Sequence, residues 1–137
     1  MTQFDIQNNI NAEIEKFRTA YPIDIVYPNT DYTPVEGTDY IQVFYINGVV
    51  TQVEFGQNSP NRTATILQMN IITSPNEGNY QAKVIVDAMQ PYFKRGQTIH
   101  NNALFTRVTS FILVDPVEEA HDYMQIVRVA TRSDYEN

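Results

Sequence analysis

Residues 39–72 place the strongest constraint on the fold, because three strand-like runs follow one another there with very little intervening chain. β-Branched and aromatic residues dominate the runs, as is typical of strands. The runs cover residues 40–46, 49–55 and 63–72. Asn47-Gly48 lies between the first two and predicts a two-residue hairpin, because both positions tolerate positive φ. The segment therefore predicts a block of antiparallel strands.

Two amphipathic helices are predicted on either side of this block. An apolar stripe at helical spacing predicts the first helix over residues 6–20. The stripe consists of Ile6, Ile10, Ile14 and Phe17. A second stripe predicts a helix over about residues 80–92, in which Pro91 should kink or shorten the last turn. Gly96 is expected to end it.

Shorter strand patterns occur outside the block and the helices, at residues 23–27, 103–114 and 123–131. We expect Asp115-Pro116 to break the second of these, and His100 to lie in a turn. Residues 133–137 are predicted to be a frayed polar tail.

The order of these elements defines a fold class. A block of strands with two helices predicts an α+β fold, with a single mixed or antiparallel sheet of about five to six strands and two main helices packed on one face. The chain of 137 residues is long enough for one domain, which we expect to span residues 1–137. Apolar residues fall on both faces of the strand at residues 40–46, so the second face should be covered by helices or by a neighbouring subunit.

Composition excludes several classes of protein. The absence of cysteine excludes disulfides and thiolate zinc sites. The formal net charge of −7 argues against a phosphate-binding protein, since such domains cluster Lys and Arg. A negative surface suits a passage that repels DNA better than a site that binds it. There is no signal-peptide pattern and no apolar run near the ~18 residues that span a bilayer, so we expect a cytoplasmic protein without a membrane segment.

Catalytic and metal-binding patterns are also missing. His121 stands beside Glu118, Glu119 and Asp122, which could form a metal or acid–base site, a charged interface or a solvated acidic loop. The solvated loop is favoured, because metal ligands usually converge from separate rigid elements. No nucleophile elbow, phosphate loop or apolar-flanked carboxylate pair occurs elsewhere. We therefore expect a protein that is not an enzyme and needs no cofactor.

The polar loop of residues 56–62 is the remaining candidate site. One interpretation is a solvated connection between two strands. The other is an arm that contacts a neighbouring chain, with Arg62 pairing to a carboxylate or stacking on an aromatic ring. The contact residues would be Gln57, Asn58 and Asn61, whose amide groups both donate and accept hydrogen bonds, together with Arg62.

The order of motifs resembles the tail terminator-like proteins of long-tailed bacteriophages, over nearly the whole chain. The motifs are the N-terminal helix, Tyr27-Pro28-Asn29, Thr33-Pro34, Asp39-Tyr40-Ile41-Gln42-Val43, Glu54-Phe55-Gly56, Arg62, Gln68, Pro75, Gly78, Tyr92-Phe93-Lys94-Arg95-Gly96 and Tyr123-Met124-Gln125-Ile126-Val127. Order and spacing carry the resemblance, since no single motif is specific. One departure is Asp122-Tyr123, where the family favours Trp-Tyr.

The resemblance implies assembly, not chemistry. Such proteins form a ring, usually a hexamer, that caps the tail tube, stops its polymerisation and presents a surface to the head connector, while DNA passes through without specific binding. It implies a virion tail protein, assembled in the host bacterial cytoplasm. Partners would be further copies of the chain, the tail tube protein and the head connector, and the isolated chain could be a monomer.

Two hypotheses about residues accompany the resemblance. Glu118, Glu119 and Asp122 would face the lumen of the ring, where carboxylates let a polyanion slide without sticking. Gln57, Asn58, Asn61 and Arg62 would form the subunit or tube contact. Two alternatives stay open: another head–tail neck or joining protein, and a small-molecule-binding α+β domain with its pocket between sheet and helices.

Overall fold

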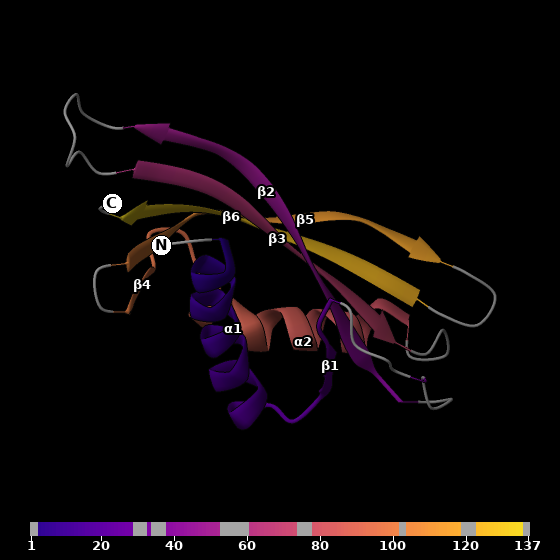
Figure 1. The fold of residues 1–137 in the computed structure, drawn as a ribbon. Coiled ribbons are helices and arrows are strands. Elements are labelled where there is room, and N and C mark those ends of the chain that lie inside the picture. The colour runs from indigo at the N-terminus through magenta and orange to yellow at the C-terminus, as the bar shows by residue number, and fades with distance from the viewer. Residues whose placement is uncertain are drawn as a thin grey trace.

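The computed structural model describes residues 3–28, 33, 38–52, 61–73, 78–101, 104–118 and 123–135. Two helices and six strands form in this part of the chain (Figure 1). In chain order they are α1 (Gln3–Ala20), β1 (Asp24–Val26), β2 (Tyr40–Gln52), β3 (Asn61–Thr73), α2 (Gly78–Phe93), β4 (Thr98–Asn101), β5 (Leu104–Glu118) and β6 (Tyr123–Tyr135).

The strands form one mixed sheet in the order β1-β2-β3-β6-β5-β4. β1 pairs in parallel with β2, and every other neighbouring pair is antiparallel. The four long strands β2, β3, β6 and β5 arch strongly, and both helices lie on the same side of them (Figure 1). The predicted α+β fold with two helices on one face is therefore confirmed.

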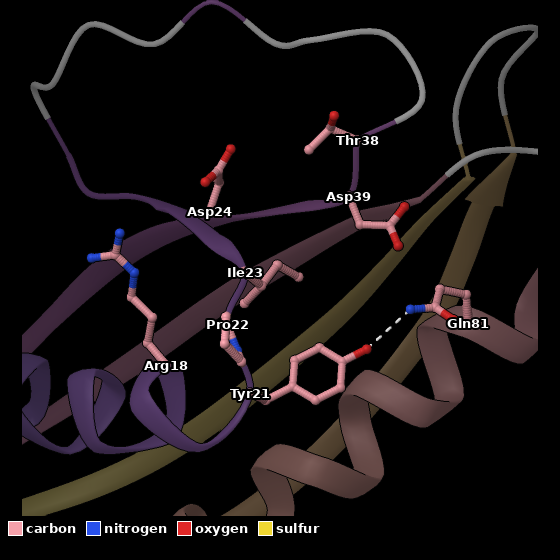
Figure 2. A pocket seen from close by; sticks show the side chains of 8 residues that line it. All are labelled: Arg18, Tyr21, Pro22, Ile23, Asp24, Thr38, Asp39 and Gln81. Atoms are coloured by element: carbon pink, nitrogen blue, oxygen red, sulfur yellow. Dashed lines mark hydrogen bonds between the residues drawn. The ribbon is translucent and has the colours of Figure 1, made fainter.

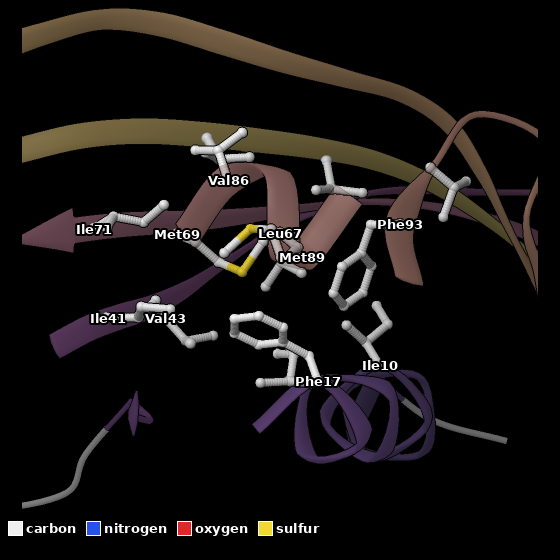
Figure 3. Close-up of a cluster of buried hydrophobic side chains, with 14 of the residues drawn as sticks. Ile10, Phe17, Ile41, Val43, Leu67, Met69, Ile71, Val86, Met89 and Phe93 are labelled. Atoms are coloured by element: carbon white, nitrogen blue, oxygen red, sulfur yellow. The ribbon is translucent and has the colours of Figure 1, made fainter. Parts of the chain in front are cut away.

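The helix α1 forms because its apolar residues share one face. Ile6, Ile10, Ile14 and Phe17 are all about 99% buried or more. The last three residues of the helix, Arg18, Thr19 and Ala20, are exposed. Tyr21 N–H still donates to Phe17 C=O at 2.8 Å before Pro22 prevents the helix from continuing. Figure 3 shows Ile10 and Phe17 pointing into the cluster of buried side chains between the helices and the sheet.

The second helix, α2, fills the other half of this core with Ile85, Met89 and Phe93. It runs two residues past Pro91, so the proline does not shorten it. Gly96 then adopts φ +88°, a left-handed conformation that costs glycine little and that commonly follows a helix. Its N–H donates to Val108 C=O at 2.8 Å and links the end of α2 to β5.

The predicted hairpin at Asn47-Gly48 is wrong. β2 continues through both residues to Gln52 and stays paired with β3. The register shifts between Asn47 and Val50, where one extra residue of β2 is accommodated. This irregularity is a β-bulge, in which glycine is also common, so the dipeptide alone did not distinguish a bulge from a turn.

Three other local predictions are also wrong. Asp115-Pro116 does not break β5 but lies at a second register shift, between Val114 and Val117. Prolines are tolerated at such bulges and on edge strands. His100 lies in β4, opposite Phe105, and not in a turn. Residues 133–135 belong to β6, and Ser133 is fully buried.

A buried hydrogen-bond chain explains why this last segment is ordered. The Thr106 and Ser133 hydroxyls lie 2.9 Å apart, and Asn9 on α1 donates to Thr106 Oγ1 at 3.2 Å and to Ile99 C=O at 3.3 Å. The chain therefore connects α1 with β4, β5 and β6. Satisfied polar groups of this kind are tolerated in a core, whereas unpaired ones are costly.

We expect Asn9→Ala to lower the free energy of unfolding by about 1–3 kcal/mol, because it leaves the buried Ile99 carbonyl and Thr106 hydroxyl with fewer partners. Urea unfolding followed by circular dichroism would measure the loss. Asn8→Ala, one residue earlier on the exposed side of α1, is the matched control. Equal losses in the two variants would show that the buried hydrogen bonds contribute little.

Candidate interaction surfaces

One face of the sheet lies away from both helices, and we call it the open face. Side chains alternate between the two faces along each strand. The alternation places on the open face Phe44 and Ile46 of β2, Arg62, Ala64, Ile66, Gln68 and Asn70 of β3, Arg107, Ser110, Ile112, Val114 and Val117 of β5, and Met124, Ile126, Arg128, Ala130, Arg132 and Asp134 of β6. The predicted helices therefore cover only one of the two apolar faces.

The open face exposes large apolar side chains. The exposed fraction is 44% for Phe44, 48% for Ile46, 54% for Ile112 and 42% for Val117. Across the sheet, Ile46 lies opposite Ile66, and Val114 opposite Ile126. Several exposed large apolar side chains on one face are typical of a surface that contacts another protein.

Besides apolar side chains, the open face also carries positively charged arginines. On β3, β5 and β6 the open face carries four arginines at its paired positions, Arg62, Arg107, Arg128 and Arg132, against one carboxylate, Asp134. Arg62 donates from Nε to Asp134 Oδ1 at 2.8 Å, and this contact raises the pKa of Arg62. Arg132 Nε lies 4.0 Å from Asp134 Oδ2. A chain with a net charge of −7 thus presents a locally basic face.

Sequence reasoning found only one of these arginines. The missed signal was the spacing of Arg128, Arg132 and Asp134, whose even intervals along one strand place them on a single face. Arg128 also donates from Nε to Gln68 Oε1 at 3.1 Å, so polar groups of β6 and β3 are tied together on this face.

The structure tests the predicted contact loop only at its end. Asn61 and Arg62 begin β3, where Asn61 pairs with Gln52 and Tyr135. Gln57 and Asn58 lie outside the described residues. The Arg62 side chain is 38% exposed and lies against Asp134, a carboxylate of its own chain.

The predicted acidic set is likewise described only in part. Glu118 is the last residue of β5 and pairs with Tyr123, whereas Glu119, His121 and Asp122 lie outside the described residues. Over the described ranges, no three His, Asp or Glu residues group in a way that could hold a metal ion. No helix in that part of the chain is long and apolar enough to cross a membrane.

A hollow lies where α1 meets β1, and sequence reasoning did not predict it. Its volume is about 610 Å³, and Figure 2 shows its lining residues, Arg18, Tyr21, Pro22, Ile23, Asp24, Thr38, Asp39 and Gln81. Gln81 Nε2 donates to the Tyr21 hydroxyl at 3.0 Å and holds α2 against the end of α1. Among the described residues, the lining of this hollow contains no histidine, serine or cysteine.

Two half-buried tyrosines are expected to make stability sensitive to alkaline pH. Burial, and then the Glu15 carboxylate, raises the pKa of Tyr27 to about 12, against a smaller opposing effect of Arg18. Burial also raises the pKa of Tyr45, whose hydroxyl donates to Asn11 Oδ1. The unfolded chain loses these protons near pH 10, whereas the folded chain keeps them.

Stability from these two tyrosines should therefore be complete below about pH 10 and be lost as the pH rises towards 12. Urea unfolding at pH 8 and pH 11 would measure the loss. The double variant Tyr27→Phe/Tyr45→Phe should lose less stability between the two pH values than the unmodified chain. An equal loss would assign the alkaline sensitivity to other groups.

A family model described as phage tail terminator protein matches residues 5–131. The chain belongs to the phage tail terminator family, a structural and non-enzymatic class of protein. A comparison with curated protein sequences found no match.

Two solved structures share the fold. One carries no descriptive name and aligns with a TM-score of 0.66 at 19% identity, covering 96% of each chain. The other belongs to the virion of a native gene transfer agent particle, with a TM-score of 0.54 at 14% identity, covering 93% of this chain and 92% of that one. At these identities the likeness concerns the fold alone.

Proposed function

We propose that this protein terminates a phage tail. Copies of the chain form a ring, in our proposal a hexamer, that caps the tail tube, stops its polymerisation and presents a surface to the head connector. It acts in the virion tail after assembly in the host bacterial cytoplasm. The observation that carries the proposal is the family match over residues 5–131, to which the exposed open face adds a surface suited to protein contacts.

The open face can make both apolar and charged contacts with another protein. Exposed Ile112 and Phe44 supply apolar area, and Arg128 and Arg132 supply cations that can pair with carboxylates of a partner. Aromatic residues and arginine are enriched where proteins meet, because each combines large contact area with directed hydrogen bonds. The open face is thus a candidate for contact with another copy, the tube or the connector.

DNA passes through the ring in this proposal without being bound. The net charge of −7 disfavours phosphate contacts over most of the surface. Glu118, Glu119 and Asp122 remain the proposed lumen residues. A ring structure that placed these three carboxylates on the outer wall would overturn this assignment.

The decisive experiment is the mass in solution across a concentration series, measured by light scattering after size exclusion, with and without purified tail tubes. A ring-shaped species of six chains, or attachment to tube ends that stops their growth, would support the proposal. Binding to a purified head connector but never to tubes would instead indicate another neck protein. A monomer that leaves tubes growing would overturn the proposal.

The proposed contact of the polar loop has its own test. We expect Asn61→Ala/Arg62→Ala to weaken ring formation or tube capping, because the change removes an amide of the predicted contact loop and a cation from one end of the open face. The matched control is Lys83→Ala, which removes an exposed cation from α2. If the double variant assembles and caps like the unmodified chain, this contact assignment is wrong.

A further inference from the structure

The two outer long strands of the sheet each have an unpaired edge in the part of the chain that the structure describes. β1 pairs with β2 only at Tyr40–Gln42, which leaves residues 43–52 of β2 open on that side. β4 pairs with β5 only at Leu104–Arg107, and Gly96 and Gln97 extend this pairing to Val108, which leaves residues 109–118 open. Each open segment is ten residues long. An exposed strand edge offers backbone donors and acceptors to another strand.

Exposed apolar side chains gather on these two segments. Five of the seven large hydrophobic side chains that are exposed in the described residues lie there: Phe44, Ile46, Ile112, Leu113 and Val117. Neither segment contains a lysine or arginine, and the residues that can protect an edge, Asp115, Pro116 and Glu118, lie only at or beyond the bulge of β5. Both segments therefore have the character of surfaces that become covered.

The directions of the strands match for pairing between copies. Each neighbouring pair in the order β2, β3, β6, β5 is antiparallel. The fourth strand, β5, therefore runs opposite to the first, β2. Copies related by rotation around a ring keep these directions, and β5 of one copy then meets β2 of the next as an antiparallel neighbour. The helices of all copies would remain on the same side of the joined sheet.

The short strands β1 and β4 restrict the register of such a pair. They cover opposite ends of the sheet, so the open segments meet only if neighbouring copies are shifted along the strand direction (Figure 1). A shift of this kind is also what a closed sheet of tilted strands requires. The two open segments can be aligned end to end, skipping one extra residue at the bulge after Asn47 and one at the bulge after Val114. In this alignment Phe44 lies opposite Val117, and Ile46 lies opposite Val114.

This register also matches the faces of the sheet. Phe44 and Ile46 project from the open face, and so do Val114 and Val117. We propose that residues 43–52 of one copy pair with residues 109–118 of the next, which joins the sheets of the ring through backbone hydrogen bonds. The inference rests on the proposed ring and names the segments that hold it together.

The absence of cysteine makes disulfide trapping a clean test. Chains carrying only Phe44→Cys or Ile46→Cys are mixed with chains carrying only Val114→Cys or Val117→Cys, and each mixture is oxidised. Directly opposed strand residues lie within the Cα separation that a disulfide needs. Mixed dimers are expected for Phe44→Cys with Val117→Cys and for Ile46→Cys with Val114→Cys.

The control mixture pairs Phe44→Cys with Tyr80→Cys, whose position on α2 is 74% exposed and far from both edges in sequence. Edge pairing should give at least about tenfold more mixed dimer than this control, because bound thiols have a high effective concentration. Circular dichroism would confirm that every variant is folded. If no β2–β5 mixture exceeds the control, edge pairing is overturned.

The masses of the same unoxidised samples separate this inference from the proposed function. A ring by light scattering without β2–β5 disulfides would keep the ring and overturn the edge pairing. Mixed dimers without a ring, alone or on purified tail tubes, would keep the pairing and overturn the ring. The absence of both would overturn both.

Discussion

Phe17→Ala is expected to lower the free energy of unfolding by about 3–5 kcal/mol, the largest effect of any single change considered for this chain. Phe17 is 1% exposed and points into the core between α1 and α2 (Figure 3). Its ring stacks on Tyr21 with centroids 5.9 Å apart and meets Tyr92 edge to face at 6.1 Å. Removing it leaves a cavity and takes away both ring contacts.

A loss of this size is a large share of the stability of a small domain, which is about 5–15 kcal/mol. The midpoint of thermal unfolding should fall by roughly 10–20 °C. Phe44→Ala is the matched control, because it removes the same atoms from a side chain that is 44% exposed on the open face. If Phe44→Ala destabilises the isolated chain as much as Phe17→Ala, the burial of Phe17 is not the reason for its contribution to stability.

Ile46→Lys is expected to prevent ring assembly while leaving the fold intact. Ile46 is 48% exposed in the single chain, so the loss of its partial burial should cost only about 1 kcal/mol. In the proposed edge pair, a lysine at this position would place an unpaired positive charge among apolar side chains of the contact. We expect the concentration needed for half-assembly to rise by at least about 10²-fold, which corresponds to a cost of roughly 3 kcal/mol.

Light scattering over a concentration series would measure this shift, and urea unfolding would measure the stability of the single chain. Tyr80→Lys is the control, because it introduces the same charge on an exposed part of α2. Assembly of Ile46→Lys at the concentration of the unmodified chain would exclude residue 46 from the subunit contact. A similar weakening by Tyr80→Lys would indicate that net charge, and not the edge, controls assembly.

Local patterns in the sequence predicted the helices well. The apolar spacing of Ile10, Ile14 and Phe17 corresponds to one buried face of α1, and Gly96 has the positive φ expected after a helix. These features depend on residues within one or two turns of each other, so the sequence carries them directly. The α+β class followed from the order of the elements, and the family followed from the order of the motifs.

The strand boundaries were predicted less well, because pairing partners decide them. Asn47-Gly48 and Asp115-Pro116 have the composition of turns, yet β3 and β6 keep the chain extended on both sides of each dipeptide. Residues 133–135 look like a polar tail until Ser133 meets the buried hydroxyl of Thr106. Such contacts join residues far apart in the chain, and no local pattern reports them.

The sequence by itself determined the helices, the fold class, the lack of cysteine chemistry and the likeness to tail terminators. Only the tertiary structure showed that Arg62, Arg128, Arg132 and Asp134 share the open face of the sheet. Within the described residues, it also showed that the short β1 and β4 leave part of the edges of β2 and β5 unpaired. The physical reason is that a strand's partners are set by the packing of the whole sheet, whereas a helix satisfies its backbone hydrogen bonds within its own segment.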